Sequence, residues 1–171
     1  MFFEGLILLA TGVSTSQGQP LAKADAGFVQ CYEPDDSKRT CQSIASYQKT
    51  GDGRWDNVAV VLIPAAQAIT LQTVTPVRVR GSAVCGFIRS EDIRKGTLRV
   101  SGRRLSDEQA APILGKIAAS LASLTAKEIC TTYVAGETDW IAKAQVTGGA
   151  PVPDQRMRWI RPADGYQVAS R

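Results

Sequence analysis

The chain has 171 residues, with 20 lysines and arginines, 16 aspartates and glutamates, four cysteines and no histidine, for a formal net charge of +4. This length is typical of one domain with its own hydrophobic core, and the lack of histidine removes the commonest acid–base catalyst and metal ligand at neutral pH. Four cysteines without paired Cys-x-x-Cys spacing favour disulfides in an oxidising compartment over a zinc site. We therefore expect neither a metal nor another cofactor.

The N-terminal segment has features of a secretion signal. The apolar residues 5–10 are followed by small residues, and Ser14 and Ser16 suit a signal-peptidase site. We expect a signal peptide over residues 1–16, with cleavage as late as residue 26, and one α+β domain over 27–171 in the periplasm or outside the cell. Because no lysine or arginine precedes the apolar run, the alternative is a buried N-terminal strand of a cytosolic protein. No later segment is apolar and long enough to span a membrane.

Turn chemistry selects one of the three connectivities that four cysteines allow. Residues 33–40, between Cys31 and Cys41, are rich in turn formers. We predict that Cys31 pairs with Cys41 and clamps a hairpin. Cys85 then pairs with Cys130 and joins the strand before the main helix to the strand after it.

Most of the chain has the pattern of β-strands. Alternating polarity and β-branched residues predict strands over 27–33, 40–48, 55–64, 68–80, 83–88, 97–101, 129–134, 140–147 and 157–160. Residues 50–53 form a turn between the second and third of these. Pro76 predicts that the strand over 68–80 is an edge strand or a bulged one, because proline cannot donate to a sheet ladder.

One main helix is expected over residues 106–124. Ser106 and Gln109 match a capping box. An apolar stripe recurs at helical spacing, formed by Ile113, Ile117, Leu121 and Leu124 together with Leu114 and Ala118. We expect its Ile113, Ile117 and Leu121 face to lie on the sheet. A shorter helical turn is expected at residues 90–93. The predicted fold is α+β, a mainly antiparallel sheet of about 6–8 strands with one principal helix (about 106–124) packed on it and two disulfides.

Basic residues concentrate in one segment. Residues 78–104 contain eight arginines and lysines against Glu91 and Asp92, a local balance of +6. Alternation places Arg78 and Arg80 on one strand face, and Arg99 joins that face if its strand is a neighbour. Because guanidinium groups bind phosphate and carboxylate bidentately, the anion-binding candidates are Arg78, Arg80, Arg99, Arg103 and Arg104. The alternative is an arginine-rich sheet edge that keeps the protein soluble.

No catalytic residue is assigned from the sequence. A Ser-x-x-Lys that begins at Ser46 and a Lys-Thr-Gly that begins at Lys49 share one lysine, whereas penicillin-binding enzymes carry these motifs on separate elements. Glu137 and Asp139 form a carboxylate pair, but their hydrophilic, turn-like setting favours solvated charge over acid–base chemistry.

The expected function is an exported, non-catalytic binding or interaction domain that recognises an anionic envelope component or a protein partner. Nucleic acid is not an expected partner, because the aromatic residues do not interleave with the arginines. Two alternatives remain open. One is a small hydrolase that uses carboxylates or a serine without histidine, and the other is a structural or inhibitor-like module that acts through the loop of residues 31–41.

Overall fold

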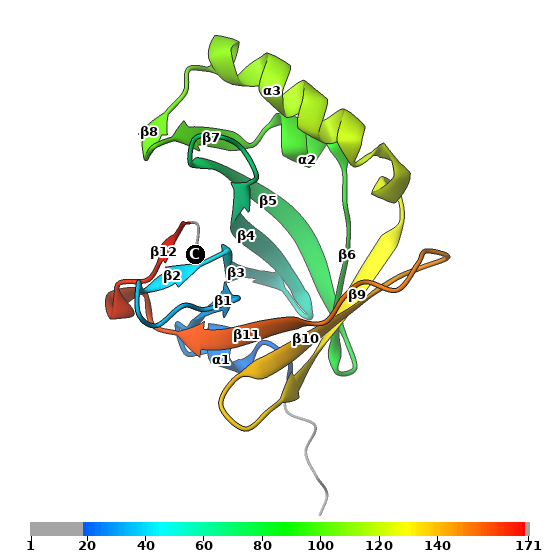
Figure 1. The fold of residues 1–171 in the computed structure, drawn as a ribbon. Coiled ribbons are helices and arrows are strands. Elements are labelled where there is room, and N and C mark those ends of the chain that lie inside the picture. Colours follow the sequence, from blue (N-terminus) through cyan, green and yellow to red (C-terminus); the bar gives the residue numbers. More distant parts are fainter. Residues whose placement is uncertain (1–18, 170–171) are drawn as a thin grey trace, which may run out of the picture.

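The computed structural model describes residues 19–169 (Figure 1). The strands are β1 (Val29–Tyr32), β2 (Thr40–Cys41), β3 (Ser43–Gly51), β4 (Arg54–Ile63), β5 (Ile69–Arg80), β6 (Ala83–Phe87), β7 (Thr97–Val100), β8 (Arg103–Arg104), β9 (Glu128–Ala135), β10 (Trp140–Val146), β11 (Gln155–Ile160) and β12 (Gln167–Val168). The helices are α1 (Ala22–Asp25), α2 (Ser90–Arg94) and α3 (Asp107–Ser120), with 3₁₀ turns at Ala122–Leu124 and Pro162–Asp164. Every segment predicted to be extended contains a strand, and the short strands β8 and β12 were not predicted.

The sheet closes on itself. Strands β4, β3, β1, β11, β10, β9, β6 and β5 follow one another as antiparallel neighbours, and β5 pairs back onto β4. The prediction of an α+β fold with one principal helix packed on a sheet is therefore wrong, and the protein is a closed eight-stranded antiparallel barrel with extra strands. Alternating polarity identifies the apolar face of each strand but fits an open and a closed sheet equally well, so closure is a property of the pairing alone.

Strand β5 belongs both to the barrel and to the additional strands β7 and β8 that extend the sheet. One side of β5 pairs with β4 along ten residues, while the other side pairs first with β7, through Ile69 to Gln72, and then with β6, through Val77 to Arg80. Pro76 lies between these two partners. The prediction that β5 is an edge strand or a bulged one is therefore wrong, because proline is tolerated here where the strand changes partner on one side.

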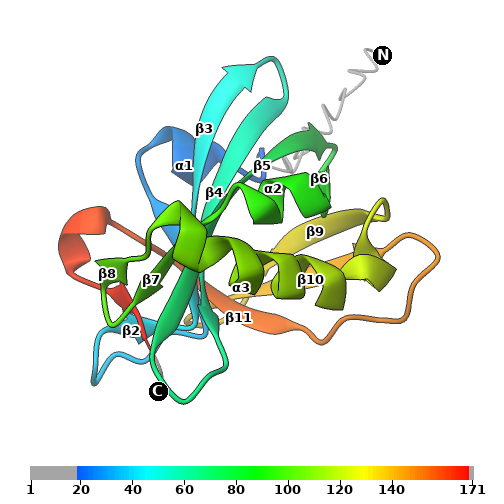
Figure 2. The ribbon, with the colours of Figure 1, turned by 90° about the horizontal axis from the view of Figure 1, so that it is seen from above.

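The apolar side chains form two main clusters on the concave side of the sheet. The first fills the barrel and includes Trp55, Met157 and Trp159. The second lies under α3 and includes Leu71 of β5 and Leu98 of β7. Figure 1 and Figure 2 show α3 above one end of the barrel, so that α2, α3 and β7 form an arch over it.

Helix α3 begins as predicted but presents a slightly different face. The Ser106 hydroxyl accepts from the Gln109 backbone N–H, and the Gln109 side chain accepts from the Ser106 N–H, which completes the capping box. The fully buried residues of the helix are Ala110, Leu114 and Ala118. Leu114 and Ala118 belong to the predicted stripe, but the side expected to face the sheet, Ile113, Ile117 and Leu121, is only partly buried along the margin of this face. Helical spacing alone did not show which side of the stripe is buried, because the alanines Ala110 and Ala118 complete the buried face.

Both predicted disulfides are present, Cys31–Cys41 and Cys85–Cys130. The loop closed by the first bridge lies against β11, where Arg158 donates to Asp36 at 2.5 Å and to Asp139 at 2.6 Å. The Tyr166 hydroxyl and the Arg158 guanidinium, which both donate to Asp36, lower the pKa of the Asp36 carboxyl below its usual value. The loop of residues 31–41 is thus bound to the barrel wall at its centre.

The predicted signal peptide over residues 1–16 lies outside the described residues. Just after it, Leu21 is 1% exposed and belongs to the cluster that fills the barrel, next to α1. A chain cut at residue 26 would lose this core side chain.

Over residues 19–169, no helix is long and apolar enough to cross a membrane.

Replacement of Leu114 by alanine tests the position of the buried face. Leu114 is 4% exposed, so Leu114→Ala should lower the free energy of unfolding by about 2–5 kcal/mol through lost burial and a residual cavity. Lys116→Ala, on the exposed side of the same helix, should change it by less than about 0.5 kcal/mol. Urea unfolding of the two variants measures both values, and equal midpoints would show that this face is not buried.

Candidate functional site

A cluster of polar side chains lies inside the barrel. Gln30 of β1 is 0% exposed, and three tyrosine hydroxyls surround its Oε1 atom. They belong to Tyr32 at 3.0 Å, Tyr47 at 2.9 Å and Tyr133 at 3.4 Å, which come from β1, β3 and β9. Strand alternation turns all four side chains toward the barrel axis, because Gln30 lies opposite Ala45 of β3 and Tyr133 lies opposite Ala142 of β10 in register.

The hydrogen-bonding capacity of this cluster is only partly used. A carbonyl oxygen has two lone pairs, so Gln30 Oε1 cannot accept from all three hydroxyls at once. The Tyr133 hydroxyl is also 3.2 Å from that of Tyr47, and Asn57 Nδ2 donates to Tyr47 at 3.3 Å. Among the described residues, the buried Gln30 Nε2 and Asn57 Oδ1 atoms have no hydrogen-bond partner. A buried polar atom without a partner costs free energy, so the surrounding side chains leave the hydrogen bonding of this cluster incomplete.

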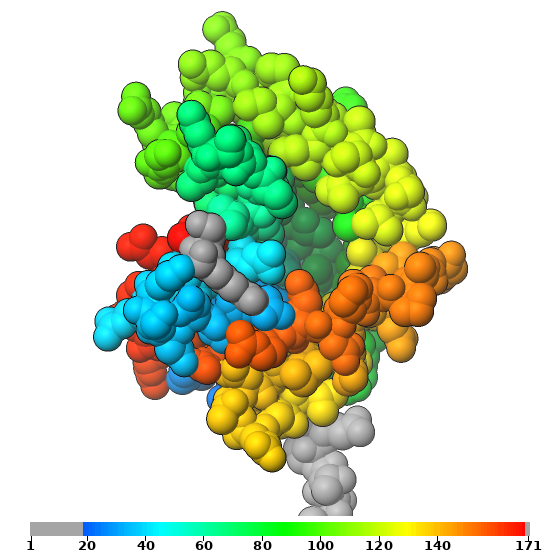
Figure 3. Space-filling model, viewed as in Figure 1, coloured from blue at the N-terminus to red at the C-terminus, as the bar shows by residue number. Residues whose placement is uncertain are grey.

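A cavity of about 200 Å³ lies against this cluster. Several of the residues that border it on β4, β5, β6 and β9 are small, namely Ala59, Thr75, Gly86 and Thr131. Larger apolar side chains, among them Trp55, Met157 and Trp159, belong to the cluster that fills the rest of the interior. Figure 3 shows the molecule hollowed between α3 and the strands β1 and β11, on the side where the barrel faces the arch.

The cavity is electrically neutral. In the part of the chain that the structure describes, no charged side chain lines it. Burial raises the pKa of the Tyr32 and Tyr47 hydroxyls well above the usual value, and the nearby Tyr133 raises both further. Tyr32 and Tyr47 therefore stay protonated at neutral pH and can each donate or accept a hydrogen bond.

The sequence contains a signal for this site, which is the presence of polar residues at inward-facing strand positions. Gln30 and Tyr32, like Tyr47 and Asn57, occupy inward positions of predicted strands, where apolar residues are the norm. Four polar side chains at inward positions indicate either a network or a ligand site. They became recognisable only when closure brought β1, β3, β4 and β9 around one axis.

The structure does not gather the predicted anion-binding arginines into one surface. Arg99 shares the outer face of Arg78 and Arg80, but it lies opposite Thr70, about 26 Å along β5 from Arg78 at the usual rise per residue. Arg80 is paired with Glu128. The other candidates lie on β8 at the far end of the arch: Arg103 and Arg104. There, Arg104 is 3.9 Å from Asp107.

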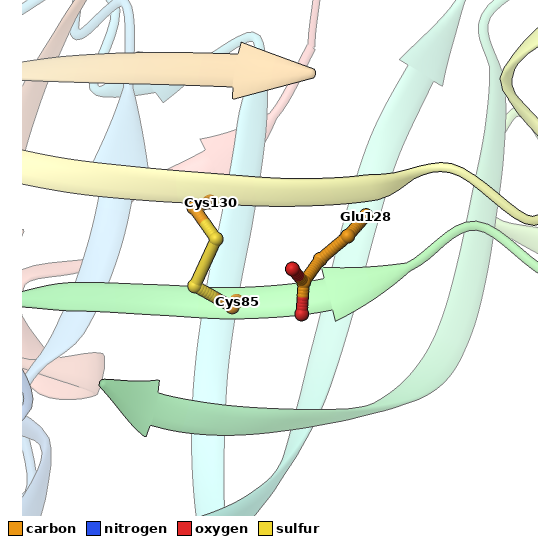
Figure 4. A group of neighbouring side chains, drawn as sticks. All are labelled: Cys85, Glu128 and Cys130. Carbon is orange, nitrogen blue, oxygen red and sulfur yellow. A yellow bond between two sulfur atoms is a disulfide. The ribbon is translucent and has the colours of Figure 1, made fainter. Parts of the chain in front are cut away.

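Other groups singled out by their chemistry are already engaged. The sulfur atoms of Cys85 and Cys130 lie near the Glu128 carboxylate (Figure 4), but they are bonded to each other and Glu128 is bound by Arg80. Asp139, one of the carboxylates considered for hydrolysis, is 8% exposed and bound by Arg158 at 2.6 Å. These contacts give the carboxylates structural partners.

Comparisons with protein-family models, with curated proteins and with solved structures found no match to this chain.

The buried tyrosines should make the protein sensitive to alkaline pH. A group whose pKa is raised by folding contributes its full stability below its unfolded value, about 10 for tyrosine, and loses that contribution as the pH rises toward its folded value. The free energy of unfolding should therefore fall above about pH 10, and Tyr47→Phe should make this fall less steep. Urea unfolding across an alkaline pH series measures both slopes, and identical slopes would contradict the raised pKa of Tyr47.

Proposed function

We propose that this protein is an exported binding protein that holds one compact, uncharged, partly apolar small molecule in its barrel. The observation that carries the proposal is the cavity of about 200 Å³ that is lined by the three tyrosines around Gln30 and by Asn57, whose buried Oδ1 atom has no hydrogen-bond partner among the described residues. An interior that served packing alone would place apolar side chains at these inward positions, because burying polar groups with incomplete partners is costly.

The size of the cavity limits the ligand. Eight-stranded barrels have interiors that side chains fill or that hold one small ligand. A dry apolar cavity of about 150 Å³ is large enough to bind benzene, so about 200 Å³ accommodates one substituted ring or a molecule of similar bulk. Val77, Val84 and Ile129 supply apolar wall area for such a body.

The polar groups define its chemistry. Asn57 Oδ1 can accept from a hydroxyl or N–H of the ligand, and the tyrosine hydroxyls that line the cavity can donate to a carbonyl or ether oxygen. A charged ligand fits poorly, since an ion without a counter-charge in a buried site loses its hydration without compensation. A neutral amide or alcohol can form both kinds of hydrogen bond.

The two disulfides support the location that the proposal assumes. Bridges such as Cys31–Cys41 and Cys85–Cys130 persist in oxidising environments, which favours the periplasm or the cell exterior. Binding in the barrel, not catalysis, is the activity that the neutral tyrosine and amide cluster supports.

Titration with benzamide, benzyl alcohol and benzoate tests the proposed ligand class. The two neutral compounds should raise the melting temperature in a saturable way, because a ligand that binds the folded state stabilises it, and benzoate should bind more weakly. Ala59→Leu adds a side chain to the cavity wall and should weaken neutral binding by at least about tenfold. Val58→Leu, at the neighbouring outward position of β4, is the matched control and should leave the affinity unchanged.

A second pair of variants tests the polar contact and not the volume of the cavity. Asn57→Leu removes the amide that lines the cavity, whereas Gln48→Leu removes an exposed amide. Only Asn57→Leu should lower the affinity for benzamide. Absence of saturable binding by both neutral compounds, or equal affinity in the wild type, Ala59→Leu and Asn57→Leu, would refute the proposal.

A further inference from the structure

A second cavity, of about 250 Å³, lies where the outward side chains of β4, β5 and β6 meet. Its charged lining residues are Arg54, Arg78, Arg89 and Glu128. Arg54 and Arg78 are outward because they alternate with Trp55 and Val77, which belong to the barrel core. The cavity shares Val77, Gly86 and Phe87 with the barrel cavity, but it carries positive charge where the barrel is neutral.

The central feature of this cavity is a pair of facing arginines. Arg54 of β4 and Arg78 of β5 are direct partners in the antiparallel register, so their side chains leave the sheet side by side on one face. Like charges in this arrangement are destabilising. Within residues 19–169, neither arginine forms an ion pair with a carboxylate. Among the described residues, no ion pair therefore offsets the repulsion between them.

The surrounding residues hold the charges in place. The guanidinium of Arg54 lies over Gly51, where an added Cβ would be 3.3 Å from its Nε atom and 3.6 Å from Nη2. Arg89 is fixed by two bonds to Asp92, at 2.9 Å and 3.1 Å. Glu128 is the one carboxylate among the described lining residues, and Arg80 binds it. The cavity thus keeps two uncompensated guanidiniums next to the apolar ring of Phe87, which is 44% exposed.

We propose that this cavity binds a small oxyanion group, a phosphate or a carboxylate, between Arg54 and Arg78. Each guanidinium can offer two parallel N–H donors to such a group, and the bound anion would neutralise the repulsion between them. This site goes beyond the proposed function, because it lies on the outer wall and selects for negative charge, whereas the barrel cavity selects against it. Of the arginines predicted from the sequence as anion ligands, only Arg78 lies here.

Calorimetric titration with inorganic phosphate at low salt tests the site. Arg54→Gln and Arg78→Gln should each weaken phosphate binding at least about tenfold, while Arg103→Gln, an exposed arginine of β8, should leave it unchanged. Both site variants should fold, since removing either charge relieves the repulsion. Gly51→Ala keeps the net charge and displaces the Arg54 guanidinium, so it should also weaken phosphate binding, and this separates a built site from general attraction to a basic protein.

The source of the anion is distinguished by two further measurements. Binding to vesicles that contain phosphatidylglycerol but not to pure phosphatidylcholine vesicles, with competition by phosphate, would assign the site to a lipid headgroup. Phosphate binding without vesicle binding would assign it to a soluble anion. Either result supports the site. Lack of saturable phosphate binding, or an equal loss in Arg78→Gln and Arg103→Gln, would overturn it, and neither result depends on what the barrel cavity binds.

Discussion

Ten residues of β4 pair with ten residues of β5. This pairing closes the barrel, and the same two strands continue past the barrel to the region under α3, where β7 pairs with β5. At the Arg54 end the inward residues of the two strands pack inside the barrel, and at the Ile63 end they pack under α3. Because the strands are continuous, the interior and the arch share one concave surface. Helix α3 therefore does not pack on the eight-stranded barrel itself. It packs over the Ile69 end of β5, which pairs with β7 and not with β6.

Closure also explains why polar residues can occupy the barrel interior. An inward glutamine or tyrosine on an open sheet would be exposed or would meet a helix, whereas in the barrel Gln30 meets hydroxyls from β1, β3 and β9. Such a network is rigid when its members are satisfied and costly when they are not. Asn57, whose Oδ1 atom has no hydrogen-bond partner among the described residues, borders the space left by small side chains. An unsatisfied hydrogen-bonding group and an unfilled cavity thus lie at the same place in the barrel. This favours a bound ligand over a purely structural network of hydrogen bonds.

Strand β5 separates two environments of opposite character. Its inward residues Thr75 and Val77 face a neutral cavity, and its outward residue Arg78 faces a cationic one. The two cavities share Val77, Gly86 and Phe87, near Pro76, where the partner of β5 on one side changes from β7 to β6. On its other side, β5 stays paired with β4 from Ile69 to Arg78 across this change of partner.

The sequence by itself determined the local features. These are the strands, whose side chains alternate; the capped start of α3, where Ser106 and Gln109 bond to each other; and the Cys31–Cys41 bridge across a turn. Each depends on residues close in the chain or on a single period. The closed sheet, the buried face of α3 and both cavities were decided only by tertiary structure. Arg54 and Arg78 are 24 positions apart and face each other only because of the β4–β5 register, and Gln30 meets Tyr133 only in a barrel. The alternation of side chains along a strand is compatible with both an open and a closed sheet, and only the pairing of distant strands decides between them. Residues that lie far apart in the sequence therefore form a site only after the sheet has closed.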